Sequence, residues 1–154
     1  MKLKRTDDPF DTRPKGAVLS VRFVVSLLLV VLGIAWIVYY YVAMRADPFV
    51  ADSKAGSPAF LADLERWNYV IGFGLFFLGL ALSAHPSTPL GRGRGVVAGM
   101  LGCFIVGLLW ICTFYVVADG KIDSIPVMND LRQSNLVVGI AFMAVGFTFA
   151  TRWE

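Results

Sequence analysis

The chain has 154 residues, of which 57% are hydrophobic and only 16% are charged, and its formal net charge is +3. This composition, with a mean hydropathy of +0.69, excludes an ordinary soluble domain and predicts an integral membrane protein. It also argues against a nucleic-acid-binding protein, because the basic residues flank apolar runs and form no patch interleaved with aromatic residues.

Residues 1–22 form a charged tail with six basic residues, three aspartates, two prolines and one glycine. This composition is typical of a flexible segment, and we predict a cytoplasmic tail. The apolar run that follows is too long for a signal peptide and lacks a small-residue cleavage site. We therefore expect the tail to stay on the mature protein.

Four apolar runs follow the tail, and each predicts a transmembrane helix. The predicted spans are Phe23–Met44, Tyr69–Ala84, Val96–Val117 and Leu136–Ala150. The first run, at about 1.5 Å per residue, is long enough to cross a hydrocarbon core of about 30 Å. The second run is at the lower limit, so we place Trp67, Asn68 and His85 at the membrane interfaces.

Polar segments rich in the helix-breaking residues Pro and Gly separate these spans. Residues 43–66 and 118–134 are predicted loops, and residues 58–67 are expected to form a short surface helix because apolar residues recur there at helical spacing. A turn rich in Pro and Gly, residues 85–95, joins the two halves of the chain. The predicted fold is therefore all-α, with four transmembrane helices arranged as two helical hairpins.

The positions of Lys and Arg predict the orientation. Nine of them lie in the tail, the central turn and the C-terminus, and five lie in the other two loops. By the positive-inside rule, both termini and the central turn are expected to be cytoplasmic, so the two hairpins run parallel. The expected location is the cell membrane, as a multi-pass protein.

The first and third spans share a sequence pattern. Residues 33–42 read GIAWIVYYYV, and residues 107–116, 74 positions later, read GLLWICTFYV. At an offset of 67, residues 68–72 (NYVIG) fall on residues 135–139 (NLVVG). Apolar stretches resemble one another by composition alone, but a shared Trp and a shared Asn in matching order favour duplication over chance.

We therefore predict a helix–loop–helix unit that is used twice. The first copy is residues 23–85, a cytoplasmic linker is residues 86–95, and the second copy is residues 96–154. The drop in offset from 74 to 67 indicates that the second loop is seven residues shorter, a change that loops tolerate.

Residues with catalytic or ligand-binding chemistry are scarce. None of the four spans contains an ionisable residue of the kind that a transporter or proton relay uses. His85 is the only histidine, and Cys103 and Cys112 are nine positions apart, which fits neither CxxC nor a zinc site, so we interpret both cysteines as small packing residues. With no catalytic triad, paired carboxylates or phosphate loop, we predict no enzyme, metal, cofactor or small-molecule substrate.

Small residues recur in the third span at a spacing that lets helices approach closely. Gly95, Gly99, Cys103 and Gly107 are four positions apart and share one face. We favour the interpretation that this stripe seats the third helix against its neighbours in the chain. The alternative is a face that binds a partner protein.

Other candidate packing or interface residues occur in both copies. Glycines seven apart lie nearly on one face of each returning helix and are expected to hold the hairpins together. The tryptophan indoles need a hydrogen-bond acceptor, and the asparagines are predicted to cap the returning helices. These residues are Gly33, Trp36, Asn68, Gly72 and Gly79 in the first copy and Trp110, Asn135, Gly139 and Gly146 in the second.

The repeated motifs resemble those of the actinobacterial cell-division membrane protein CrgA family, whose members are usually one two-helix hairpin. The shared features are a first helix ending Gly-Leu-Ala-Trp-Ile-Val-hydrophobic-Tyr-Val, a returning helix opening Trp-Asn-hydrophobic-Val-hydrophobic-Gly-Phe, and a C-terminus near Arg-Trp. In this chain they match residues 33–42, 67–73, 107–116, 135–139 and 151–154. The chain differs from the family in being doubled and in lacking a densely basic N-terminus.

The resemblance implies a non-enzymatic protein of the division septum, which helps coordinate septal peptidoglycan synthesis with the FtsZ ring through contacts with other divisome membrane proteins. Dimerisation stays open. A different class also stays open, namely an accessory subunit that stabilises a larger membrane complex such as a respiratory oxidase. A small multidrug-type transporter has four helices too, but the missing membrane carboxylate argues against it.

Overall fold

The computed structural model describes residues 20–46, 50–54, 56–117 and 121–152, and within these ranges every regular element is a helix. This agrees with the predicted all-α class. Most of the predicted tail, residues 1–19, lies outside the described residues.

The first hairpin consists of two long helices. Helix α1, Val21–Tyr39, begins at Ser20, whose Oγ accepts a hydrogen bond from the Phe23 N–H at 3.2 Å. Its last turn continues as a π-helical turn, Tyr40–Met44 (η1), and the chain returns as α3, Arg66–Ser83. Between them lies the short helix α2, Ala59–Ala62, which is shorter than the helix predicted for residues 58–67.

The second hairpin repeats this plan. Helix α4, Arg94–Cys112, also ends in a π-helical turn, Thr113–Val117 (η2), and its partner is α6, Ser134–Ala150. The loop between them holds a 3₁₀ turn and a one-turn helix, neither of which was predicted. These are Ile122–Ser124 (η3) and Met128–Leu131 (α5).

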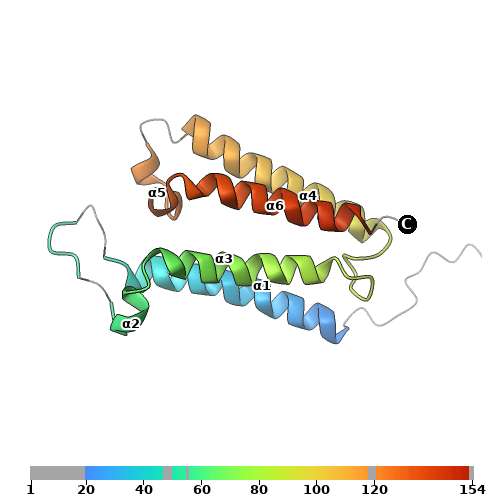
Figure 1. Cartoon of the computed structure of the whole chain (residues 1–154), viewed down its shortest axis with the longest axis horizontal. Coiled ribbons are helices and arrows are strands. Elements are labelled where there is room, and N and C mark those ends of the chain that lie inside the picture. Colours follow the sequence, from blue (N-terminus) through green and yellow to red (C-terminus); the bar gives the residue numbers. More distant parts are fainter. Residues whose placement is uncertain (1–19, 47–49, 55, 118–120, 153–154) are drawn as a thin grey trace, which may run out of the picture.

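The hairpins lie side by side, with α3 of the first facing α6 of the second (Figure 1). One end of the molecule carries α2 and α5 and is called the short-helix end; the other carries residues 84–93 and is called the connector end. The connector is compact, because the buried Thr88 Oγ1 donates to the Ser83 and His85 carbonyls and accepts the Gly91 N–H at 3.0 Å.

Three of the described helical segments are long and apolar enough to cross a membrane: Val21–Met44, Arg66–Ser83 and Arg94–Val116. The predicted fourth span corresponds to α6, which is apolar but has 17 residues. Large apolar side chains point outward from the two outer helices, for example Leu28 at 62% exposure and Leu109 at 60%. Such surfaces suit contact with lipid.

Each long helix begins two or three residues before its predicted apolar run. Polar residues such as Arg66 and Arg94 occupy the added turns. The prediction placed each start at the first apolar residue, whereas the first turn of a helix at the membrane surface can hold polar side chains in water.

Candidate functional site

Aromatic side chains join the hairpins in the middle of the α3–α6 contact. Phe76 and Phe77 of α3 both meet Phe142 of α6 edge to face, with ring centroids 5.6 and 4.9 Å apart. Phe73 contacts Trp110 of α4 at 6.0 Å. Pairs of this geometry add about 0.5–1.5 kcal/mol each beyond their buried area. The interface between the hairpins is therefore apolar at its centre.

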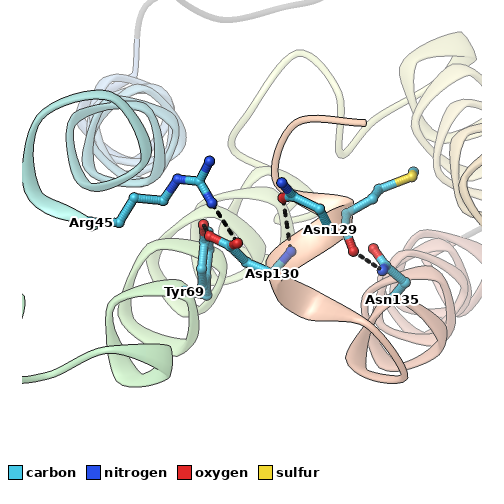
Figure 2. Close-up of polar contacts among 6 residues, drawn as sticks. Arg45, Tyr69, Asn129, Asp130 and Asn135 are labelled. Carbon is cyan, nitrogen blue, oxygen red and sulfur yellow. Dashed lines mark hydrogen bonds and ion pairs between the residues drawn. The ribbon is translucent and has the colours of Figure 1, made fainter. Parts of the chain in front are cut away.

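A group of polar residues at the short-helix end, which we call the polar clamp, consists of Arg45, Tyr69 and Asp130. Arg45 Nη1 donates to Asp130 Oδ1 at 2.6 Å, and the Tyr69 hydroxyl donates to Asp130 Oδ2 at 2.6 Å (Figure 2). The Arg45 and Asp130 side chains are only 9% and 19% exposed. Because Asp130 comes from α5 and the other two residues from the first hairpin, the clamp links the two copies.

Two aromatic contacts support the clamp. The Arg45 guanidinium lies 4.0 Å from the centroid of the Tyr41 ring, within the range of a cation–π interaction. The Tyr40 ring meets the Tyr69 ring edge to face at 5.2 Å. These contacts hold the arginine and the tyrosine in the positions from which they reach Asp130.

Asn68 closes the turn between α2 and α3. Its Nδ2 donates to the Leu61 carbonyl at 2.6 Å and to the Glu65 carbonyl at 3.3 Å, seven and three residues earlier. The predicted cap is therefore wrong, because a cap accepts a backbone N–H, whereas this amide donates to carbonyls. The reason is position: Asn68 lies inside the first turn of α3, and the Leu61 carbonyl belongs to a short helix whose end lacks helical partners.

Asn135 repeats the arrangement in the second copy. Its Nδ2 donates to the Met128 carbonyl at 2.9 Å (Figure 2) and to the Arg132 carbonyl at 2.8 Å, again seven and three residues earlier. The residue three positions before each asparagine has a positive φ, 41° at Glu65 and 45° at Arg132. We call this repeated arrangement the asparagine latch.

Close glycine pairs lie where the two helices of each hairpin cross. A Cβ on Gly33 would lie 2.6 Å from the Gly72 carbonyl oxygen, and one on Gly107 would lie 2.8 Å from that of Gly139. No side chain fits at such distances. The two copies therefore cross at equivalent glycines.

The second glycine of each returning helix also lies against its hairpin partner. A Cβ on Gly79 would lie 2.7 Å from the Ser26 carbonyl oxygen of α1, and one on Gly146 would lie 2.9 Å from the Phe104 ring of α4. Both glycines therefore occupy contacts within their own hairpin.

The small-residue stripe of α4 faces the interior of the second hairpin. A Cβ on Gly99 would meet the Phe149 ring at 2.5 Å, and Cys103 is buried with Phe149. Gly95 lies against Pro89 of the connector instead of α6. Cys112 is exposed, so its interpretation as a packing residue is wrong: it lies on the outward side of α4.

Within the part of the chain that the structure describes, the two repeated tryptophans lack the hydrogen-bond acceptor that their indole N–H groups were expected to have. The indole N–H groups of Trp36 and Trp110 are buried, and neither has a hydrogen-bond partner among the described residues. Trp110 instead contributes its ring to the contact with Phe73 of the other hairpin.

His85 lies at the connector end. Arg22 Nη1 is 2.6 Å from His85 Nε2, and Ser87 Oγ is 2.9 Å from His85 Nδ1. Partial removal of the ring from water lowers the pKa of His85 below its usual 6.5, and the Arg22 and Arg152 cations lower it further. The protonated form of His85 is therefore less favourable than that of a free imidazole.

The sequence prediction missed the polar clamp. A signal was present, because the offset of 67 also places Asp63-Leu64 on Asp130-Leu131. The two aspartates nevertheless differ in the structure: Asp63 is exposed and has no ion pair among the described residues. Across those residues, no group of three or more His, Cys, Asp or Glu side chains is placed to hold a metal ion.

A family model described as "Cell division protein CrgA" matches this chain twice, over residues 4–85 and 89–154. The two successive matches confirm the predicted duplication. No solved structure matches the chain.

The relatives that carry the name cell division protein CrgA include proteins of three genera. The protein of Streptomyces avermitilis is 43% identical over 65 residues, which make up 42% of this chain and 71% of the relative. That of Corynebacterium glutamicum is 33% identical over 60 residues (39% and 54%), and that of Mycobacterium sp. strain KMS is 31% identical over 61 residues (38% and 65%). The chain thus spans less than two thirds of the last two relatives.

Proposed function

We propose that this chain, which belongs to the family of cell division protein CrgA, is a non-enzymatic membrane adaptor that helps coordinate septal peptidoglycan synthesis with the FtsZ ring. The observation that carries the proposal is the double match of the family model. The character of the described residues supports it, because the pattern shared by the two copies serves helix packing and the asparagine latches, and the clamp joins one copy to the other. An adaptor acts through surfaces of this kind.

In the membrane, the adaptor has four spanning helices with both termini and the connector end in the cytoplasm. Three helices have membrane length, and α6 packs along α4 and so accompanies it across the bilayer. The excess of Lys and Arg in the tail and connector supports this orientation. Reporter fusions at Met1 and Glu154 should report cytoplasm, and one near Gly56 should report the outside. A cytoplasmic signal at Gly56 would overturn the orientation.

A fluorescent fusion to the full chain tests the cellular role. In dividing cells of the native host, a fusion that restores function to a deletion strain should gather at midcell septa. A uniform membrane signal from the same functional fusion would contradict the division role.

Purification in mild detergent separates this role from that of an accessory subunit of a larger membrane complex, such as a respiratory oxidase. The outward apolar faces of α1 and α4 suit either kind of partner. Enzymes of septal peptidoglycan synthesis should be retained with the wild-type chain. Recovery of a stoichiometric oxidase without them would replace the adaptor role by the accessory one.

A further inference from the structure

Two cavities meet at the polar clamp. The first, about 460 Å³, opens at the short-helix end, and its charged lining residues are Arg45, Asp63, Glu65, Arg66, Asp130 and Arg132. The second, about 280 Å³, is an apolar groove between α3 and α6 lined by residues such as Phe73, Val137 and Ala141. Arg66, Tyr69 and Asp130 line both, so a polar chamber leads directly into an apolar groove.

The position of Trp67 sets the level of this pair of cavities in the bilayer. Trp67 is 66% exposed in the first turn of α3, and tryptophans of this kind lie at the headgroup level. The groove extends along α3 to Phe77, ten residues later, which is about 15 Å deeper at 1.5 Å per residue. That is half of a hydrocarbon core about 30 Å thick. The groove therefore runs from the headgroups to the middle of the bilayer, the depth of one leaflet.

The lining of the two cavities suits a flexible amphipathic molecule. The chamber end is charged, and the rest of the groove is apolar over about three turns of α3, from Arg66 to Phe77. A phospholipid has the same order, a charged headgroup followed by an acyl chain.

The charges at the entrance indicate the headgroup. Arg45 and Asp130 are paired within the clamp. Arg66, Arg132, Asp63 and Glu65 are exposed and make no ion pair with any described residue. Two cations and two anions thus remain around one chamber, an arrangement that complements a headgroup with one charge of each sign.

We propose that the chamber and the groove together bind one phospholipid with a zwitterionic headgroup. Its phosphate lies at Arg66 and Arg132, its primary ammonium at Asp63 and Glu65, and one acyl chain follows the groove. The inference rests on the membrane-spanning arrangement of the helices and not on the role in division, so loss of septal localisation would leave it standing.

Native mass spectrometry of the full-length protein tests the proposal. After delipidation in detergent, the protein is titrated with 1-palmitoyl-2-oleoyl phosphatidylethanolamine or with the phosphatidylglycerol of the same chains. We expect one phosphatidylethanolamine adduct, and at least tenfold weaker binding of phosphatidylglycerol, which lacks the ammonium group. Equal or tighter binding of phosphatidylglycerol would overturn the headgroup assignment.

Matched variants locate the site. Ala141→Phe fills the groove and should weaken the adduct at least tenfold, whereas Ala144→Phe, on the exposed side of the same helix, should leave it unchanged. The double variant Arg66→Gln/Arg132→Gln should likewise weaken phosphatidylethanolamine binding at least tenfold. Arg94→Gln at the connector end should leave the binding unchanged. Circular dichroism of each variant establishes that it is folded. Equal phosphatidylethanolamine binding by Ala141→Phe and Ala144→Phe would overturn the proposal. Equal binding by the double variant Arg66→Gln/Arg132→Gln and by Arg94→Gln would overturn it too.

Discussion

At the scale of single residues, Asn68 and Asn135 show how one side chain fixes the geometry of a turn. Each amide donates to two carbonyls on its N-terminal side, one from a short helix and one from a residue with positive φ. Only a donor fits this environment. An aspartate of the same shape offers two more acceptors in place of the N–H groups.

The change Asn68→Asp therefore tests the latch. We expect it to lower the free energy of unfolding by about 1–3 kcal/mol, because the Leu61 and Glu65 carbonyls lose their donor and a carboxylate takes the place of a buried amide. The measurement is unfolding by sodium dodecyl sulfate in mixed micelles, followed by circular dichroism. Gln133→Glu, the same amide-to-acid change at an exposed neighbouring position of the second latch, is the control and should shift stability by less than about 0.5 kcal/mol. Equal losses in both variants would show that added charge, and not the latch, is responsible.

His85 gives a prediction for pH. As the only histidine, it yields one Hε1 resonance, and its titration followed by NMR should give a pKa below 6.5. Because the folded state disfavours the proton, the contribution of neutral His85 to stability is fully present above pH 6.5 and is lost as the pH falls through the lowered folded-state pKa. Arg22→Gln should move the pKa back toward 6.5, since one neighbouring cation is removed. A pKa at or above 6.5 in the wild type would contradict the described environment.

At the scale of helices, the crossing of each hairpin depends on backbone contact at glycine. Gly107 and Gly102 offer a comparison within α4, because a Cβ on Gly107 meets the Gly139 carbonyl oxygen, whereas one on Gly102 has no neighbour within 4 Å. The two positions have the same helical backbone, so their difference reports only the contact with α6.

We expect Gly107→Ala to cost about 1–3 kcal/mol by forcing α4 and α6 apart. Gly102→Ala should be neutral or stabilising, by up to about 1 kcal/mol, because alanine is the better helix former. The same detergent unfolding assay compares them. A crossing that tolerates Gly107→Ala as well as Gly102→Ala would mean that the helices do not approach as closely as described.

The long helices were predictable because an apolar run long enough to cross a bilayer dictates a helix whatever its neighbours. The short elements were not. Helix α5 has four residues, too few to show a period, and it exists because Asn135 and the clamp hold it. The π-helical turns Tyr40–Met44 and Thr113–Val117 likewise have no sequence period of their own, although the two copies place them within one residue of the same repeat position.

At the scale of the whole molecule, the polar clamp makes the two copies unequal. Asp130 binds Arg45 and Tyr69 across the hairpin interface, while its repeat counterpart Asp63 is exposed. A repeat in the sequence predicts two similar hairpins, but it does not say which faces meet, because that depends on side chains from both copies at once. The packing of α3 against α6 could therefore not be predicted from the sequence repeat.

Replacing each aspartate by alanine measures this asymmetry. Asp130→Ala should lower the free energy of unfolding by about 2 kcal/mol, because it removes the carboxylate that a partly buried arginine and a tyrosine both contact. Asp63→Ala, the equivalent change in the first copy, should alter it by less than about 0.5 kcal/mol. The unfolding assay in mixed micelles applies again. Similar values for the two variants would show that the clamp does not stabilise the pair of hairpins.

The compact connector, residues 84–93, has a consequence for the living cell. Because a short connector, kept compact by Thr88, joins α3 to α4 in one chain, each hairpin stays within reach of the other, at an effective concentration in the millimolar range typical of short tethers. Separate hairpins would dock by a bimolecular reaction in the plane of the membrane, and dilution during growth would take them apart. In one chain the docking is unimolecular, so the clamped pair has a fixed one-to-one stoichiometry whatever the level of expression.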